Sequence, residues 1–152
     1  MYDVINYVNC SREQLLEILH MRNLDSIRLW MTNPEVISEE NHFDFVKRLN
    51  GNKERLYFAI YRNGLLMGTY NLTKEEDGVW ERGIFANPAT QGKGETQKWE
   101  CQILSELQEQ GVKAVTAKVK QNNRKSIRYH EKLGYQEKSR DNEFIYYILR
   151  LQ

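Results

Sequence analysis

The sequence has little of several features that mark specialised proteins. Its formal net charge is only +1, so no excess of cations exists to neutralise the phosphates of a nucleic acid or of an anionic membrane. No apolar run approaches the roughly 20 residues that a membrane-spanning helix needs. The opening letters MYDVINYVNC lack a basic segment followed by an apolar core, which excludes a secretory signal of the usual kind. We therefore expect a cytoplasmic protein that binds neither nucleic acid nor membrane.

Cysteine and proline are also scarce. The two cysteines, Cys10 and Cys101, have no metal-ligand spacing, so we expect two reduced thiols and no metal. The two prolines are Pro34 and Pro88, and no repeat, low-complexity segment or linker interrupts the chain. Residues 1–152 are therefore predicted to form a single domain, as a monomer or a homodimer.

The hydrophobic pattern predicts an α/β (α+β) fold with one mixed sheet flanked by about four helices. Ser11 and Gln14 predict a capping box, Pro34 and the Ser38 cluster each predict a helix opening, and Asn63-Gly64 predicts a type I′ hairpin turn. A meander followed by a β-α-β crossover predicts a change to parallel pairing near the middle of the sheet. Strands are expected at 2–8, 55–62, 65–73, 79–86, 112–119 and 143–151, and four helices are expected: one after 11, one that opens at 34 or 38, one after the glycine loop and one after 123.

The stretch NPATQGKGETQKWE, at 87–100, places glycines between a strand and an amphipathic helix. A Walker A loop needs glycine where Asn87 stands and a hydroxyl residue where Gly94 stands, so the kinase interpretation fails. The three-glycine dinucleotide fingerprint is also missing. What remains is a tight loop whose backbone amides, at a helix N-terminus, can hold an anionic group such as a pyrophosphate.

The second informative segment is NRKSIRYHEKLGY, at 123–135. The order strand, glycine loop, helix, strand, Asn-x-x-Ser-Ile and Lys-Leu-Gly-Tyr resembles the GNAT superfamily of acyl-CoA-dependent N-acetyltransferases over essentially the whole chain. The resemblance implies that acetyl-CoA is the cosubstrate, that the loop binds its pyrophosphate, and that two splayed parallel strands grip its pantetheine arm. Ala89 departs from the family, which usually has Gln or Arg there. The implied coenzyme-binding residues are Ile84, Phe85, Ala86, Gln91, Gly92, Lys93, Gly94, Glu95, Thr96, Asn123 and Ser126.

The resemblance also implies roles in proton transfer. The superfamily commonly places a tyrosine three residues after the isoleucine of the last helix, and counting from Ile127 gives His130. We predict that His130 protonates the departing thiolate, with Tyr129 as the alternative donor if His130 is only a solvated helix residue. A backbone N–H near Phe85 would bind the thioester oxygen. Glu81 is the candidate base for the amine, unless it is simply a polar strand residue.

The N-terminal half resembles one subgroup, which N-acetylates a UDP-linked 4-amino-4,6-dideoxy sugar in pseudaminic acid biosynthesis. The matching segments are RN…IRLWM, the later His before an amphipathic helix, LTK, GIFANP and GKGET. The implied acceptor-binding residues are Arg22 and His42 for the nucleotide, Thr73 and Lys74 on the same side, and Trp30 and Met31 beside the sugar. Each has a simpler alternative as a solvated cation, a surface histidine or core.

Two other functions remain open at this point. One is a superfamily member that acetylates a protein N-terminus, such as that of a ribosomal protein, or another small amine. The other is a catalytically silent acyl-CoA-binding module, against which His130 argues only weakly.

Overall fold

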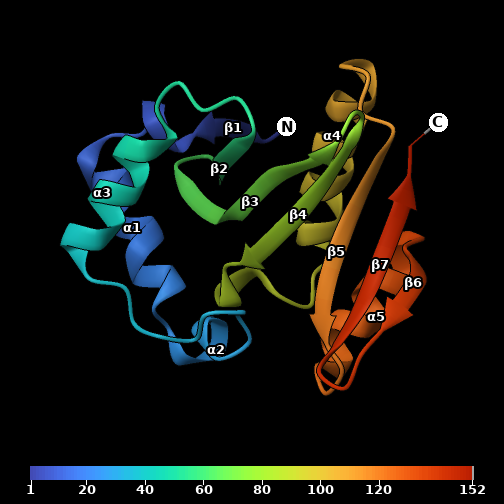
Figure 1. The fold of residues 1–152 in the computed structure, drawn as a ribbon. Helices are drawn as coiled ribbons and strands as arrows, with labels where there is room; N and C mark the ends of the chain where they lie inside the picture. The colour runs from blue at the N-terminus through green and yellow to red at the C-terminus, as the bar shows by residue number, and fades with distance from the viewer. Residues whose placement is uncertain (152) are drawn as a thin grey trace.

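The structure of the protein is a computed structural model, and residues 1–151 are described from it. Within these residues seven strands form one mixed sheet in the order β1-β2-β3-β4-β5-β7-β6 (Figure 1). Of the neighbouring strands described there, β4 and β5 pair in parallel and the others in antiparallel fashion. The strands are β1 (Asp3–Asn6), β2 (Arg55–Arg62), β3 (Leu65–Glu76), β4 (Val79–Ala86), β5 (Ala114–Lys120), β6 (Gln136–Arg140) and β7 (Phe144–Arg150).

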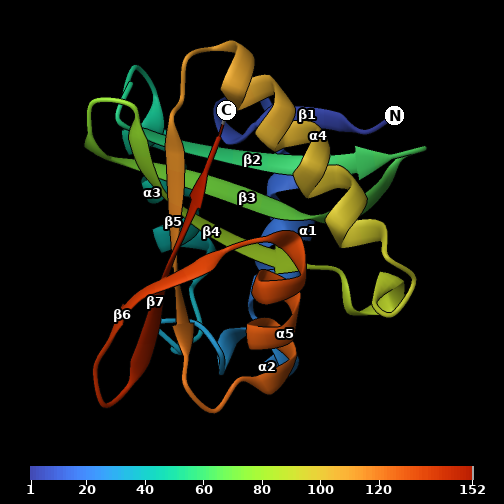
Figure 2. The ribbon, with the colours of Figure 1, turned by 90° about the vertical axis from the view of Figure 1, so that its right-hand side faces the viewer.

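Helices cover both faces of the sheet, as the two views in Figures 1 and 2 show. On one face α4 and α5 pack over a core that includes Trp99, Tyr70 and Val115. On the other face α1 and α3 pack over a second core that includes Ile18, Leu49 and Ala59. Within residues 1–151 the α-helices are α1 (Arg12–Arg22), α2 (Asp25–Arg28), α3 (Glu39–Leu49), α4 (Glu95–Glu109) and α5 (Arg124–Leu133).

The two parallel strands separate along their length. Their register runs from Val79 opposite Ala114 to Glu81 opposite Thr116 and ends there. Strand β4 nevertheless continues to Ala86, and β5 continues to Lys120. Figure 1 shows the two arrows diverging below this point. The predicted pair of splayed parallel strands is therefore confirmed.

Several local predictions are confirmed in atomic detail. The Ser11 side chain accepts from the Gln14 N–H and Gln14 accepts from the Ser11 N–H, which forms the predicted capping box. In the hairpin turn Asn63 has φ 51° and Gly64 has φ 79°, as a type I′ turn requires. Ser38 caps α3 through the Asn41 N–H.

The prediction of a helix opening at Pro34 is wrong. Arg22 donates to the carbonyls of Asn33 and Glu35, at 2.5 and 3.0 Å, and Arg28 donates to the carbonyl of Pro34 at 2.9 Å. These carbonyls accept hydrogen bonds from the two guanidinium groups. In a helix they would accept from backbone N–H groups of later residues instead. The extra helix in this region is the short α2, which begins earlier.

Two strand predictions also need correction. The first strand ends at Asn6 and not at Val8, because the Asn6 side chain accepts from the Val8 N–H and caps a 3-10 helix at Tyr7–Asn9. Strand β6 was not predicted. Its five residues, QEKSR, are all exposed, so they carry no hydrophobic alternation from which to predict a strand.

None of the helices formed by residues 1–151 is long and apolar enough to cross a membrane.

Candidate active site

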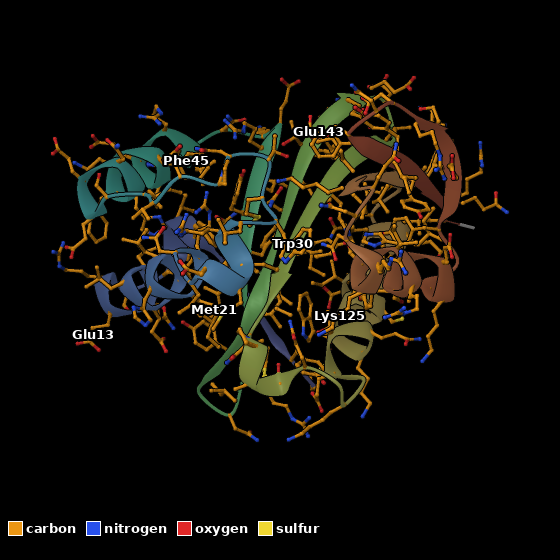
Figure 3. All side chains as sticks on the ribbon, turned by 90° about the horizontal axis from the view of Figure 1, so that it is seen from below. Glu13, Met21, Trp30, Phe45, Lys125 and Glu143 are labelled. Carbon is orange, nitrogen blue, oxygen red and sulfur yellow. The ribbon has the colours of Figure 1, made fainter. Side chains whose placement is uncertain are left out.

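A cleft of about 710 Å³ lies between the N-terminal helices and the diverging strands β4 and β5. Figure 3 views this side and shows Trp30 between the N-terminal helices and the half of the molecule that carries Lys125. Residues predicted for both substrates meet there, although they come from opposite ends of the sequence. The predicted residues that line the cleft are Arg22, Trp30, Met31, His42, Glu81, Ile84, Phe85, Ala86, Gln91, Asn123, Ser126 and His130.

The glycine loop beside the cleft has the form of an anion cradle. Gly92 and Gly94 have φ of 82° and 74°, and a Cβ built on either would meet no atom of the described residues within 4 Å. Gly94 is the N-cap of α4 and provides no side-chain hydrogen bond, so the first-turn N–H groups face no capping side chain. A pyrophosphate therefore fits this loop, because exposed N–H groups and the positive end of a 15-residue helix converge on it.

The side chain of Glu95, the first residue of α4, does not take part in the predicted pyrophosphate site. Its carboxylate accepts from Arg62 at 2.9 Å and from the Tyr2 hydroxyl. The Tyr2 hydrogen bond and the Arg62 ion pair hold the pKa of Glu95 below its ordinary value. The Glu95 side chain thus links α4 to Tyr2, which precedes β1, and to Arg62 of β2, and only its backbone N–H remains a candidate for binding phosphate.

The register of β4 identifies which backbone N–H groups face the gap between the parallel strands. The N–H of Asn87 donates to the carbonyl of Met67 on β3 at 2.8 Å. Because an antiparallel ladder alternates, the N–H of Phe85 points to β3 as well. Those of Ile84 and Ala86 point toward β5, beyond the last paired residue. The predicted oxyanion donor near Phe85 is therefore best matched by one of these two neighbours.

A buried charged network lies where the two strands begin to part. Glu100 is 0% exposed, and both its oxygens are saturated by hydrogen bonds. Arg82 reaches it through Nε at 2.8 Å and Nη2 at 2.6 Å. The hydroxyls of Tyr70, Tyr129 and Tyr135 donate to it at 2.8 to 2.9 Å. Burial raises the pKa of Glu100, but the charge and hydrogen bonds of Arg82 outweigh it, so the carboxylate is ionised.

His130 completes the network as an uncharged ring. Its Nε2 lies 2.7 Å from Arg82 Nη1, and its Nδ1 lies 2.7 Å from the carbonyl of Ser126. An arginine can only donate, so Nε2 accepts and the proton sits on Nδ1. Burial, and then the charge of Arg82, lower the pKa of His130 to about 4. His130 is therefore not a solvated helix residue, and it could act as an acid only after leaving Arg82.

The Tyr129 hydroxyl, like the His130 ring, is already engaged and is not free to protonate the thiolate. Its hydroxyl donates to Glu100 at 2.8 Å, and burial, followed by the charge of Glu100, raises its pKa. Tyr129 is not among the residues that line the cleft. The assignment of the proton donor to either residue stays a prediction.

On the acceptor side, Arg22 and His42 are buried, which excludes the interpretation of a solvated cation and a surface histidine. The guanidinium of Arg22 braces the loop at 33–35, as described above. The Nε2–H of His42 donates to the carbonyl of Leu15 at 2.9 Å. Both residues line the cleft, but these groups are already committed to backbone carbonyls.

Trp30 and Met31 lie in the cleft wall, and Trp30 is 45% exposed, so it is not a core residue. Thr73 lies on β3 opposite Glu81 but outside the lining. Lys74 is directed elsewhere, because its Nζ lies 3.4 Å from the carboxylate of Asp77. Neither Thr73 nor Lys74 is among the residues that line the cleft, so their role on the acceptor side stays a prediction. The prediction also missed residues that do line the cleft: Arg55, Tyr57, Asn71, Arg82, Lys118 and Lys120.

The sequence contains a signal for the buried pair. Glu100 falls three and four residues before Ile103 and Leu104, on the apolar stripe of α4. A charged residue on a buried stripe requires a partner of opposite charge. Arg82 and Glu81 are consecutive on β4, so their side chains lie on opposite faces of the sheet. Arg82 is therefore the charged residue of this pair that can face Glu100 when Glu81 faces the other side.

Comparisons with known proteins agree with this geometry. Residues 11–136 match the family described as "Acetyltransferase (GNAT) domain". Acetyltransferase PseH of Campylobacter jejuni (strain 81-176) is 22% identical over 150 residues, which cover 99% of this chain and 94% of that protein. The crystal structure of C. jejuni PseH with acetyl coenzyme A has a TM-score of 0.77 at 19% identity and full coverage of both chains. Spermidine N-acetyltransferase from Vibrio cholerae, solved with CoA and spermine, has a TM-score of 0.85 at 16% identity, covering 98% of this chain and 95% of that one.

Proposed function

The chain belongs to the acetyltransferase (GNAT) family and is an acetyl-CoA-dependent N-acetyltransferase, and from this premise we propose that its acceptor is a nucleotide-linked amino sugar. In the fullest form of the proposal, the enzyme transfers the acetyl group to the 4-amino group of a UDP-linked 4-amino-4,6-dideoxy sugar, as in pseudaminic acid biosynthesis. The similarity to PseH along nearly the whole chain supports this choice.

The charge of the cleft is the observation that carries the proposal. Arg55, Lys118 and Lys120 line it, and none of the three forms an ion pair within residues 1–151. The carboxylate that lines it is Glu81. Cations near a cleft attract a diphosphate and repel a polyamine. A nucleotide-linked amine therefore suits this surface better than spermidine does, although a spermidine acetyltransferase shares the fold.

The proposed chemistry assigns a task to each part of the cleft. The glycine loop and the start of α4 hold the coenzyme pyrophosphate. The N–H of Ile84 or Ala86 donates to the thioester oxygen as charge develops on it. Glu81, exposed on the acceptor face, takes the proton of the attacking amine directly or through a water molecule. Trp30 and Met31 offer an apolar wall to the C6 methyl group of the sugar.

The decisive measurement is thiol release from acetyl-CoA with three acceptors: a UDP-4-amino-4,6-dideoxy sugar, spermidine, and a peptide with a free N-terminus. We expect turnover with the sugar nucleotide and little with the other two. Turnover with the peptide or the polyamine alone would refute the acceptor assignment. Tight coenzyme binding without turnover on any amine would instead identify a silent acyl-CoA-binding module.

A matched pair of variants separates the acceptor from the coenzyme. Lys118→Glu should raise the KM for the sugar nucleotide at least tenfold and leave the KM for acetyl-CoA nearly unchanged, because Lys118 lies on the face opposite α4. Lys138→Glu on the exposed strand β6 is the control for an altered surface charge. An equal effect of the two variants would show that only the overall charge matters.

A further inference from the structure

We propose that the guanidinium of Arg82 stabilises the coenzyme A thiolate as it leaves, which makes Arg82 a further catalytic residue. The proposal rests on the acetyl-CoA-dependent reaction and not on the identity of the acceptor.

The position of Arg82 in the sheet is the first argument. Glu81 and Thr116 are the last paired residues of β4 and β5, and Arg82 follows at once, at the point where the strands part. Its side chain lies on the α4 and α5 face and reaches the cleft. If the pantetheine arm runs between the parting strands, its sulfur end approaches the closed end of the gap, which Arg82 borders. Glu81 borders the same point from the opposite face.

The orientation of the guanidinium is the second argument. Glu100 binds the edge formed by Nε and Nη2, while Nη1 points away from the carboxylate and toward His130. An arginine has five N–H donors, and these three contacts leave two without a partner within residues 1–151. The Tyr135 ring lies under the guanidinium at 5.0 Å, and the Tyr70 ring lies at 5.7 Å. The carboxylate thus fixes one edge of the guanidinium, and the two remaining N–H groups, one on Nη1 and one on Nη2, belong to a residue that lines the cleft.

The protonation of His130 is the third argument, because His130 has no proton to give at Nε2. Its one ring proton, on Nδ1, is bound to the carbonyl of Ser126. A positive charge beside the sulfur removes the need for a proton donor. Thiols ionise near pH 8.5, and neighbouring cations lower that value to about 3.5–7.5.

The proposed step balances without a further reactant. The amine nitrogen forms the new C–N bond, the C–S bond breaks, and its electron pair stays on sulfur opposite the charge of Arg82. The proton of the amine passes to Glu81 or to water. The thiolate takes a proton from water when it is released.

The test is a titration of the thiol of coenzyme A bound to the protein, followed by the ultraviolet absorbance of the thiolate, with no acetyl group and no acceptor present. We expect the bound thiol to ionise at least about one pH unit below free coenzyme A in the wild-type protein. The Arg82→Met/Glu100→Gln double variant, which removes both buried charges, should abolish the shift. Lys118→Met removes a cation from the opposite face of the cleft and should keep it.

An unshifted thiol in the wild-type protein would overturn the proposal, and so would a shift that survives in the double variant. If the double variant fails to bind coenzyme A, desulfo-coenzyme A provides the second measurement. The wild-type affinity for coenzyme A should rise about tenfold for each pH unit between the bound and free thiol pKa values, while that for desulfo-coenzyme A should stay flat. Parallel pH profiles for the two ligands would overturn the proposal. Since no sugar is used, this result is independent of the acceptor assignment.

Discussion

Glu100→Gln removes one charge from the buried pair and keeps the size of the side chain. Arg82, which is 4% exposed, would then be a buried cation without a carboxylate. Leaving one member of a buried ion pair alone costs about 3–5 kcal/mol of unfolding free energy. For a protein of this length each kcal/mol lowers Tm by about 2–4 °C, so we expect a loss of roughly 6–20 °C.

The double variant Arg82→Met/Glu100→Gln should be much less affected. It removes both charges, while the glutamine oxygen can still accept from Tyr70 and Tyr135 and the glutamine NH2 group can donate to the Tyr129 hydroxyl oxygen. Replacing both partners of a buried pair is often nearly neutral. The two single changes should therefore be strongly non-additive in a double-mutant cycle: the double variant should lose at least about 3 kcal/mol less than the sum of the two single losses, measured by urea unfolding at neutral pH.

An exposed pair in the same protein is the matched control. Arg140 and Glu137 lie 2.5 Å apart, as close as the buried pair, but on the exposed strand β6. Glu137→Gln should change stability little, because solvent screens such pairs. If Glu100→Gln were equally harmless, or if the double variant were as unstable as the single ones, the buried charge would not be the cause.

Three further predictions concern the loop, the imidazole and pH. Gly92→Asp should weaken acetyl-CoA binding at least tenfold, because a carboxylate repels the pyrophosphate and strains a backbone with φ 82°; unchanged affinity by calorimetry would refute the loop assignment. His130→Ala should lower turnover strongly with little change in coenzyme affinity, whereas His130→Gln, which can still accept from Arg82, should retain most activity. If both His130 substitutions abolish turnover while Tyr129→Phe does not, His130 is the proton donor. If Tyr129→Phe abolishes turnover while His130→Ala turns over normally, the proton donor is Tyr129. The pKa of His130 is about 4 in the folded protein and about 6.5 in the unfolded chain. Between these pH values the unfolded chain binds a proton that the folded protein does not. On the order of 3 kcal/mol of unfolding free energy should therefore be lost as pH falls from about 6.5 to about 4. Urea unfolding over this range should show a flatter profile in His130→Gln.

The sequence predicted those parts of the fold that local chemistry determines. The capping box at Ser11 and the turn at Asn63-Gly64 depend on neighbouring residues, and both are confirmed. The loop after Pro34 depends on two arginines from other segments, and no local pattern could show their carbonyl contacts.

The candidate site also combines features that neighbouring residues determine with features that depend on residues far apart in the sequence. The glycine loop was predicted because its form lies in consecutive residues. The pairing of Arg82 with Glu100, which fixes the state of His130, joins three elements that are far apart in the sequence. Lys118 and Lys120 alternate with the buried Ala117 and Val119 along β5, but the other walls of their cleft come from segments far away in the sequence. Counting along the last helix correctly identified His130 as a residue of the cleft, but could not reveal that Arg82 occupies its Nε2.

One hydrophobic core lies on each face of the sheet, and this arrangement affects which substitutions the protein can accept without unfolding. The residues proposed to hold the coenzyme lie mainly on β4, the glycine loop and α5, whereas the cleft wall proposed to face the acceptor comes mainly from the segment before β2. Substitutions in that first segment can therefore alter which amine is accepted while the packing around α4 and α5 stays intact. A chimera that exchanges residues 11–50 for those of another family member is the natural way to redirect this enzyme to a new acceptor.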